Sequence, residues 1–272
     1  MIPLDKLSYS RLDTFHTCPR AFWYAYVDGD RGGDNVYSYM GTIVHEVVEG
    51  LVSGTVNRDD AKQRFLDALD DVEVLGFEWA SDKSKDGYRE DILHFIEHFD
   101  PSYYTSEPHI EETFDVTIGG YPFHGFIDCW FETADTIIIE DFKTSSKYSK
   151  SDLEAHSMQL AVYAKALEQT AKEKNKKIVL RFNMLKYYTD GKKIVERCGC
   201  DVIGDPEPGF VYVDYNEALS GRLEQWVIET MHKIESIDPS LYYRWPKSKS
   251  PMKDFFCKKI CSHYPRCSGI AG

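Results

Sequence analysis

TIIIEDFK, residues 136–143, joins a continuous apolar run directly to charged residues. Such a run is typical of a strand that is buried on both faces. Residues i and i+2 of a strand project from the same face, so Asp141 and Lys143 are predicted to point the same way. Packing alone would not place charge at the end of a buried strand, and this position therefore indicates a functional site.

Two further strands precede this one. Residues 110–118 alternate between apolar and polar side chains, Gly119-Gly120 supplies a hairpin turn, and residues 121–131 return. If the second and third strands pair as a hairpin, Asp128 lies within a few ångströms of Asp141. Two such carboxylates make a hard-oxygen site suited to Mg²⁺ or Mn²⁺. The alternative is a strand-end ion pair of Asp141 with Lys143, and Asp128 in a turn.

Helical spacing of apolar residues predicts helices on both sides of these strands. They cover residues 8–27, 40–52, interrupted segments within 58–100, 151–175 and 216–237. A loop is expected over 29–35, and further strands over 178–188 and 210–213. The order helix, three strands, helix, strand predicts an α/β fold with an αβββαβ core. Its mixed central sheet would be flanked by helices, with helical additions at both ends of the chain.

Composition limits the class of protein. The start of the chain has no secretory pattern and no apolar run is long enough to span a membrane, so a cytoplasmic location is expected, in the host cytoplasm if the protein is viral. The net charge of −13 argues against a general nucleic-acid binder. Residues 172–197, however, hold nine Lys/Arg against three acids, and residues 242–267 hold seven against one. These segments form either a local DNA-binding surface or ordinary solvent-exposed helix and loop surfaces.

Four motifs in one order carry a resemblance to a known family. Met40–His45 is similar to a G-x-x-x-H helix, Gly125–Asp128 to G-x-I-D, Asp141–Thr144 to D-Y-K-T, and Gln159–Tyr163 to Q-L-x-x-Y. The chain thereby resembles the PD-(D/E)XK nuclease superfamily. Within it, the chain resembles the RecB-like branch, with its iron–sulfur exonucleases of the AddB type and its CRISPR-adaptation nucleases. The resemblance implies a restriction-endonuclease-like fold and a single nuclease domain over 1–272, with 39–188 as catalytic core.

The resemblance also implies roles for single residues. The metal ligands would be His45, Asp128, Asp141 and the backbone carbonyl of Phe142, and Lys143 would activate water or stabilise the phosphate. Gln159 and Tyr163, at i and i+4 on one helical face, would position DNA. A further catalytic acid would be Glu112 or Glu111. We prefer Glu112, because it shares a strand face with Phe114 and Val116.

The cysteines predict a second metal centre. Cys257, Cys261 and Cys267 form a C-x3-C-x5-C cluster, and Cys18 stands near the other end of the chain. By resemblance, these four would hold a [4Fe–4S] cluster that brings residues 1–38 and 238–272 together, although the usual spacing is C-x2-C-x5-C. Zn²⁺ at the same thiolates is the main alternative, and four unpaired thiols the other. Cys129, Cys198 and Cys200 are not expected to take part.

The expected function is Mg²⁺- or Mn²⁺-dependent hydrolysis of DNA, by an exonuclease on single-stranded or end-containing substrates. The processes implied are recombination, repair, replication or CRISPR-type processing. Residues 242–249 interleave aromatic and basic side chains, which would either stack unpaired bases or pack a helix-to-loop junction. One alternative is a non-catalytic DNA-binding or assembly subunit. Another is a nuclease that acts only with protein partners in a repair or CRISPR-type complex.

Overall fold

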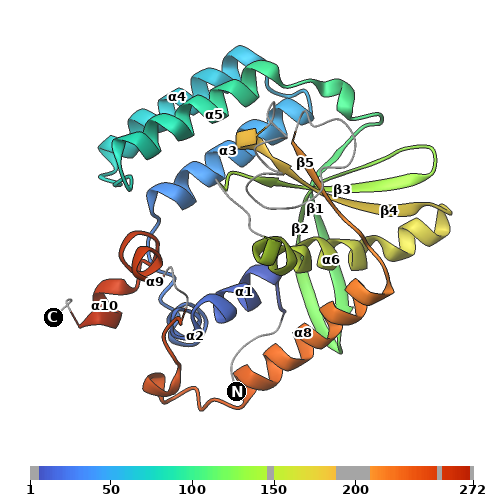
Figure 1. The fold of residues 1–272 in the computed structure, drawn as a ribbon. Coiled ribbons are helices and arrows are strands. Elements are labelled where there is room, and N and C mark those ends of the chain that lie inside the picture. Colours follow the sequence, from blue (N-terminus) through green and yellow to red (C-terminus); the bar gives the residue numbers. More distant parts are fainter. Residues whose placement is uncertain (1–5, 146–149, 188–208, 250–252, 270–272) are drawn as a thin grey trace. The chain divides into compact units, whose positions relative to one another are not determined.

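A mixed sheet forms the centre of the computed structural model, which describes residues 6–145, 150–187, 209–249 and 253–269. In those residues the sheet has five strands in the order β1-β2-β3-β4-β5 (Figure 1). The strands are β1 (His109–Ile118), β2 (Tyr121–Glu132), β3 (Thr136–Lys143), β4 (Lys177–Met184) and β5 (Phe210–Val213). β3 pairs antiparallel with β2 and parallel with β4, and β5 is antiparallel to β4. The predicted α/β architecture with a mixed, helix-flanked sheet is confirmed.

The chain divides into two compact units. Unit 1 comprises Met1–Tyr39, Asp115–Gly125 and Glu224–Gly272, and unit 2 comprises Met40–Phe114 and Phe126–Leu223. The single nuclease domain and the catalytic core over 39–188 remain predictions.

β3 is buried on both faces over its second half, as its apolar run predicts. Ile139 and Asp141 on one face and Glu140 and Phe142 on the other are all fully buried. The parallel register places Glu140 opposite Arg181 on β4, and Arg181 Nε donates a hydrogen bond to Glu140 Oε2 at 2.5 Å. Because the charged pair lies on the face opposite Asp141, it fixes the strand from behind.

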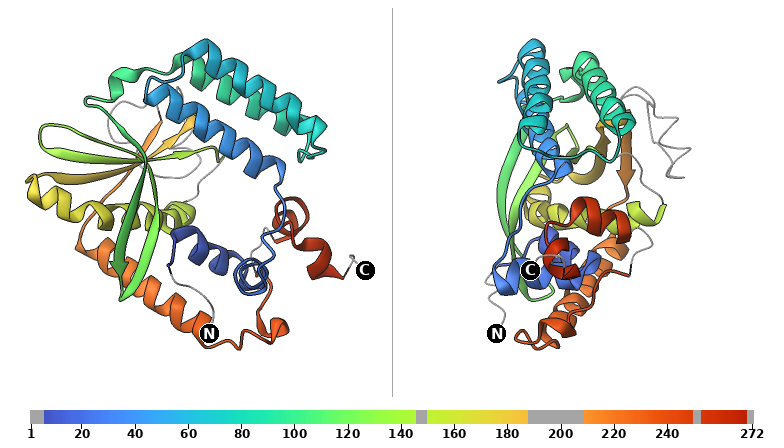
Figure 2. Two further views of the ribbon diagram at one scale, coloured as in Figure 1. Left: turned by 180° about the vertical axis from the view of Figure 1, so that it is seen from behind. Right: turned by 90° about the vertical axis from the view of Figure 1, so that its left-hand side faces the viewer.

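Helices cover the sheet of unit 2. They are α3 (Val36–Val52), α4 (Arg58–Val74), α5 (Asp82–His98) and α6 (Lys150–Glu173), and α8 (Glu217–Glu235) begins in this unit. α6 packs against β3 and β4, while α4 and α5 lie side by side (Figure 2). Asn57 and Ser81 cap α4 and α5, since their side chains accept hydrogen bonds from the backbone N–H three residues later.

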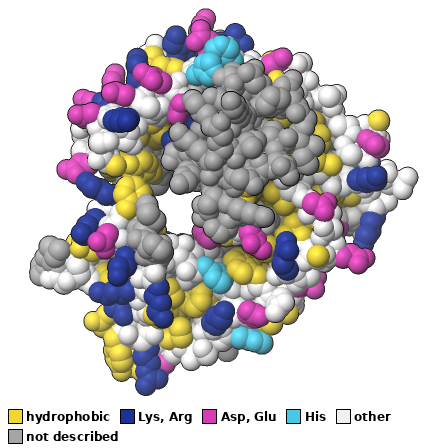
Figure 3. Space-filling model, viewed as in Figure 1, with side chains coloured by type: hydrophobic (Ala, Val, Ile, Leu, Met, Phe, Trp, Pro, Cys, Tyr) yellow, Lys and Arg dark blue, Asp and Glu magenta, His cyan; other side chains and the backbone are white. Residues whose placement is uncertain are grey.

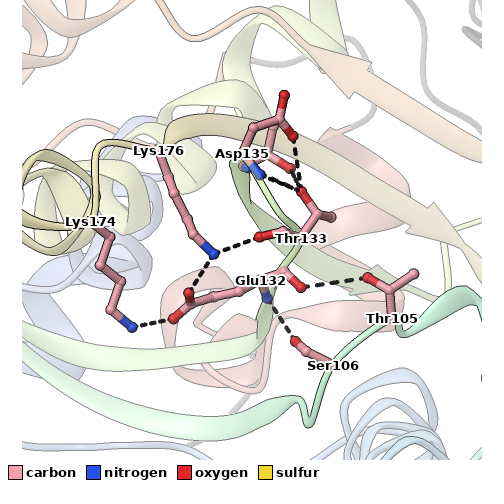
Figure 4. A network of polar contacts seen from close by, with 8 residues as sticks. Thr105, Ser106, Glu132, Thr133, Asp135, Lys174 and Lys176 are labelled. Atoms are coloured by element: carbon pink, nitrogen blue, oxygen red, sulfur yellow. Dashed lines mark hydrogen bonds and ion pairs between the residues drawn. The ribbon is translucent and has the colours of Figure 1, made fainter.

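A polar network fixes the turn between β2 and β3 (Figure 4). Glu132 forms ion pairs with Lys174 and with Lys176, the latter at 2.7 Å. Lys176 Nζ also donates to the backbone oxygen of Thr133 at 2.5 Å, and Ser106 Oγ accepts from the Glu132 N–H at 3.0 Å. These contacts join the end of β2 to the segment between α6 and β4, so they hold the strands that carry the site in register.

The predicted continuous helix over 8–27 is wrong. Instead α1 (Tyr9–Thr17) ends before Cys18, whose φ of −158° and ψ of 100° are extended, and α2 (Pro19–Phe22) begins at the proline. The residue before a proline avoids the helical region, which explains the break. A π-helical segment, Trp23–Asp28, follows and ends at Gly29, whose φ is +83°.

Two further boundaries differ from the expectation. α3 begins at Val36 and not at Met40, because Asn35 Oδ1 accepts hydrogen bonds from the N–H groups of Tyr37 and Ser38. β4 ends at Met184, where the strand was expected to continue to 188. The short helical turns are Pro101–Tyr103, Leu185–Tyr187, Tyr242–Arg244, α9 (Lys253–Phe255), the π-helical Phe256–Ile260 and α10 (Tyr264–Ser268). Over the described ranges, no helix is long and apolar enough to cross a membrane.

Candidate active site

Asp128 and Asp141 lie next to each other on neighbouring strands. β2 and β3 pair with Cys129 opposite Glu140, so the preceding residue of β2 and the following residue of β3 are adjacent. The backbone N–H of Phe142 donates a hydrogen bond to Asp128 Oδ2 at 3.1 Å. The hairpin therefore brings the two carboxylates together, as the sequence analysis expected of it.

Both carboxylates are buried. Asp141 is fully buried and Asp128 is 8% exposed. Within the described residues, Asp141 has no hydrogen-bond donor besides the Lys143 ammonium, which lies 2.5 Å from its Oδ2. Burial raises the pKa of each carboxyl to about 6, and the charge of Lys143 opposes this rise. Two adjacent buried carboxylates are costly to ionise without a cation.

Lys143 begins a chain of polar contacts that returns to Asp128. Its Nζ lies 2.5 Å from Asp141 Oδ2 and donates to Gln159 Oε1 at 2.9 Å. Gln159 Nε2 donates to the Tyr163 hydroxyl at 2.8 Å, and a hydrogen bond from Tyr163 lowers the pKa of Asp128. Gln159 and Tyr163 lie one turn apart on α6, so this helix face orients both Lys143 and Asp128.

His45 reaches the same site from α3. Its Nδ1 is 3.6 Å from Asp128 Oδ2, and its ring lies edge-on to Phe142 with centroids 6.2 Å apart. Burial lowers the pKa of His45, against the charge of Asp141 and a hydrogen bond with the Phe142 backbone. At neutral pH the imidazole is therefore uncharged, which is the form that binds a metal.

The structure places Glu111, and not the preferred Glu112, with these carboxylates. Burial and then the charges of Glu49 and Asp141 raise the pKa of Glu111. Glu112 Oε2 instead accepts a hydrogen bond from Trp130 Nε1 at 3.0 Å. Glu111 has a φ of +49°, and this left-handed residue interrupts the alternation of β1. Because the alternation is interrupted at Glu111, the strand face of Phe114 does not show which of the two glutamates faces the site.

Sequence reasoning missed Glu49. It lies four residues after His45 on α3, hence on the same helix face. Burial raises its pKa, and the charge of Asp128 raises it further. The i, i+4 spacing in His45-Glu46-Val47-Val48-Glu49 is the signal that would have found it.

Lys186 was also missed. Lys143 and Met184 are partners in the parallel register, and Lys186 follows two residues later, at the same edge of the sheet. Its Nζ lies 4.4 Å from the centroid of the Tyr88 ring. Burial lowers the pKa of Lys186 to about 8, and the charge of Asp91 opposes this. A second cation therefore lies at the edge that carries Lys143.

A divalent cation fits this donor set. Across the described ranges, no three His, Cys, Asp or Glu side chains converge closely enough, as they stand, to enclose a metal ion. The two Asp141 oxygens are nevertheless buried, and within the described residues Lys143 is the one donor that approaches them. Carboxylate oxygens and a neutral imidazole are the ligands that Mg²⁺ or Mn²⁺ would take here.

A family model matches residues 6–268, and its description is the PD-(D/E)XK nuclease superfamily. The chain belongs to this superfamily. No curated protein matched the chain. The superfamily makes the protein a nuclease, and nucleases of this kind generally use divalent metals. The RecB-like branch and its iron–sulfur members stay predictions.

In this nuclease, four cysteines lie together in unit 1. Cys18 is buried between α1 and α2, and Cys257, Cys261 and Cys267 are half-buried. Burial and the charges of the other three thiols together raise the pKa of Cys261 to about 11, against a hydrogen bond with the His263 backbone. Cys257 lies within the π-helical turn Phe256–Ile260 and Cys261 caps its end, where the Cys261 N–H donates a hydrogen bond to the Phe256 oxygen at 2.8 Å. Cys129 belongs to unit 2, and Cys198 and Cys200 lie outside the described residues.

The predicted loop over 29–35 approaches this cysteine segment closely. A Cβ on Gly32 would lie 1.9 Å from Ser262 Oγ and 2.8 Å from Ser262 Cβ. Asn35 Nδ2 donates to the Ile260 oxygen at 3.0 Å, and His263 is buried with its ring stacked on Tyr24 at 5.1 Å. Glycine at residue 32 is therefore required for the approach.

The two basic segments of the nuclease differ. In residues 172–197, Lys174 and Lys176 pair with Glu132 and Arg181 pairs with Glu140, and residues 188–197 lie outside the described residues. Three of its cations thus serve the fold. In 242–267 most described Lys and Arg side chains are exposed.

Proposed function

We propose that the protein is a Mg²⁺- or Mn²⁺-dependent deoxyribonuclease that digests single-stranded DNA ends. The observation that carries this proposal is Asp141, a fully buried carboxylate that lies beside the buried Asp128 and has the Lys143 ammonium at 2.5 Å as its nearest cation. Burying such a group costs free energy, so its retention in a nuclease superfamily fold favours a metal-binding role over an ion pair alone.

The chain's own residues would divide the work as follows. Asp128, Asp141, His45 and the Phe142 carbonyl would hold a divalent ion, with Glu111 added in place of Glu112. A bound ion supplies Lewis-acid stabilisation of the phosphate and lowers the pKa of a bound water.

Lys143 would bind the attacking water or a phosphate oxygen, since its ammonium is the cation nearest the carboxylates. Gln159 holds that ammonium in place, and Tyr163 holds Asp128 in place. Lys186, at the same sheet edge, offers a second contact for the DNA backbone.

The test is degradation of end-labelled single- and double-stranded DNA with Mn²⁺, Mg²⁺ or EDTA. Lys143→Ala should reduce cleavage by at least about 100-fold, because charge stabilisation at the phosphate is lost. Lys177→Ala is the matched control, since Lys177 is exposed on the same sheet and should leave cleavage unchanged. Cleavage in EDTA, or equal activity of Lys143→Ala, contradicts the mechanism. A wild type that binds DNA without cutting it would favour the non-catalytic subunit.

We further propose that Cys18, Cys257, Cys261 and Cys267 hold a [4Fe–4S] cluster, with Zn²⁺ as the alternative. Their grouping in unit 1 and the π-helical turn support this. A π-helical turn accommodates one extra residue in a helix, as the Cys257–Cys261 spacing requires.

Protein purified without oxygen should contain about four irons per chain and absorb broadly near about 400 nm. Cys261→Ser should lose both properties, and Cys129→Ser, in unit 2, should keep them. Stoichiometric zinc without iron would select the alternative, and loss in both variants would contradict the assignment.

From the resemblance we further propose that this activity serves recombination, repair, replication or CRISPR-type processing, with protein partners. The net charge of −13 supports a partner that supplies DNA affinity.

A further inference from the structure

Tyr242 and Tyr243 are exposed on unit 1. Their exposed fractions are 47% and 62%, and their ring centroids are 6.2 Å apart with the planes nearly perpendicular. They lie in a short helical turn, Tyr242–Arg244. Aromatic rings that remain in water at neighbouring positions offer flat apolar faces to a ligand.

Trp245, the next residue, is fully buried and anchors this turn. Its ring stacks on Phe22 with centroids 5.8 Å apart. Arg20 Nε donates to the Trp245 oxygen at 2.7 Å, and Arg20 Nη2 donates to the Tyr243 oxygen at 3.2 Å. The Arg20 N–H bonds the Pro246 oxygen at 3.0 Å. Packing and base stacking were the two roles considered for this segment. Trp245 takes the packing role, and the exposed Tyr242 and Tyr243 are held on a fixed backbone.

Positive charge surrounds the tyrosines. The Arg20 guanidinium lies 5.3 Å from the centre of the Tyr242 ring, and Arg244 and Lys247 are exposed. The segment 242–267 has seven Lys/Arg and one acid in a chain of net charge −13. Figure 3 shows Lys and Arg side chains gathered among hydrophobic ones at the lower left, where Figure 1 draws the C-terminal segment. Local charge is thus opposite to that of the whole chain.

We propose that Tyr242 and Tyr243, with Arg20, Arg244 and Lys247, form a surface that binds single-stranded DNA. Unpaired bases would stack on the two rings, and the cations would contact the phosphates. A duplex fits less well, because its bases are already stacked on one another. A backbone fixed by Trp245 and Arg20 reduces the entropy lost on binding. This inference rests on DNA being the substrate of the proposed function.

The test measures binding of fluorescein-labelled oligothymidylate to the full chain by anisotropy, in EDTA to prevent cleavage. Tyr242→Ala/Tyr243→Ala should weaken binding about 10- to 100-fold, the loss expected for one or two stacked bases. Tyr242→Phe/Tyr243→Phe keeps the ring faces and should bind as wild type does. Val74→Ala, which removes an 85% exposed apolar side chain from unit 2, is the control and should change nothing.

Salt dependence gives a second measurement. Arg244→Gln should reduce the slope of log K against log salt by about 0.7, the value for one phosphate contact on a single strand. The proposal is overturned if the double alanine variant binds oligothymidylate as tightly as wild type does. It is also overturned if the variant loses as much affinity for duplex DNA as it loses for oligothymidylate. This binding assay can fail while the proposed function holds. That function is tested separately, by comparing DNA cleavage by wild type and by Lys143→Ala.

Discussion

The backbone N–H of Phe142 donates a hydrogen bond to Asp128 Oδ2 at 3.1 Å. This bond ties the strand that carries Asp141 and Lys143 to the carboxylate of the neighbouring strand. Phe142, the residue between Asp141 and Lys143, thus holds the Asp128 carboxylate next to the strand that carries Asp141 through its backbone N–H.

Glu111→Gln and Glu112→Gln form a matched pair. We expect Glu111→Gln to lower Mn²⁺-dependent cleavage about 10- to 100-fold, as is usual when a group near a metal is neutralised. Glu112→Gln should cleave normally and lose at most about 1 kcal/mol of unfolding free energy, because its carboxylate bonds Trp130. Cleavage rates at saturating Mn²⁺ and unfolding free energies in urea compare the two variants. A larger loss of cleavage in Glu112→Gln than in Glu111→Gln would assign the catalytic acid to Glu112.

Asp141→Asn should stabilise the protein in EDTA at pH 7.5. Burial raises the folded pKa of Asp141 to about 6, above its value of 3.8 as a free side chain. The folded state therefore binds the Asp141 proton more tightly than the unfolded state does. The stabilisation that this gives is present below about pH 4 and is lost as the pH rises through about 6. Asparagine cannot ionise, so the variant should gain on the order of 2 kcal/mol at pH 7.5 and less at pH 4.5. Urea unfolding at both pH values measures this, and a variant less stable than wild type at pH 7.5 contradicts it.

Arg181→Met should cost about 3–5 kcal/mol of unfolding free energy, since Glu140 would remain as an unpaired buried carboxylate. The second change Glu140→Leu should recover much of that loss. Lys177→Met serves as an exposed control. Denaturant unfolding gives the free energies, and a double variant no better than the single one would assign the loss to packing.

Gly32→Ala should lower the metal content of the cysteine site and destabilise the protein by about 1–3 kcal/mol. Rotation of the Ser262 hydroxyl removes the 1.9 Å contact, but the 2.8 Å contact with Ser262 Cβ remains, at a φ of +70°. Gly33→Ala is the control, since no atom lies within 4 Å of its added Cβ. Metal analysis and thermal unfolding should separate the two variants, and identical behaviour would refute the close approach.

Sequence patterns predicted the sheet and the proximity of Asp128 to Asp141, because both features follow from local order along the chain. The apolar run before Glu140 predicted a buried strand, and the predicted pairing of the second and third strands as a hairpin placed Asp128 beside Asp141. The alternation pattern favoured Glu112 over Glu111, because such a pattern does not reveal a left-handed residue inside a strand, here Glu111 with a φ of +49°. The helix break at Cys18 follows from Pro19, because the residue before a proline avoids the helical region. Lys186 could not be found, because only the β3–β4 register, which pairs Lys143 with Met184, shows that it follows at the same edge of the sheet.

Unit 1 also has a consequence for synthesis of the chain. Its first segment, Met1–Tyr39, leaves the ribosome early, and its last, Glu224–Gly272, leaves after every residue of unit 2 has been made. At about 5–20 residues per second, Cys18 waits on the order of 10 s or more for Cys257. Asp128, Asp141 and Lys143 therefore exist as a complete set before the four cysteines do. A ribosome that stops before residue 224 releases a chain that contains Asp128, Asp141 and Lys143 but lacks Cys257, Cys261 and Cys267.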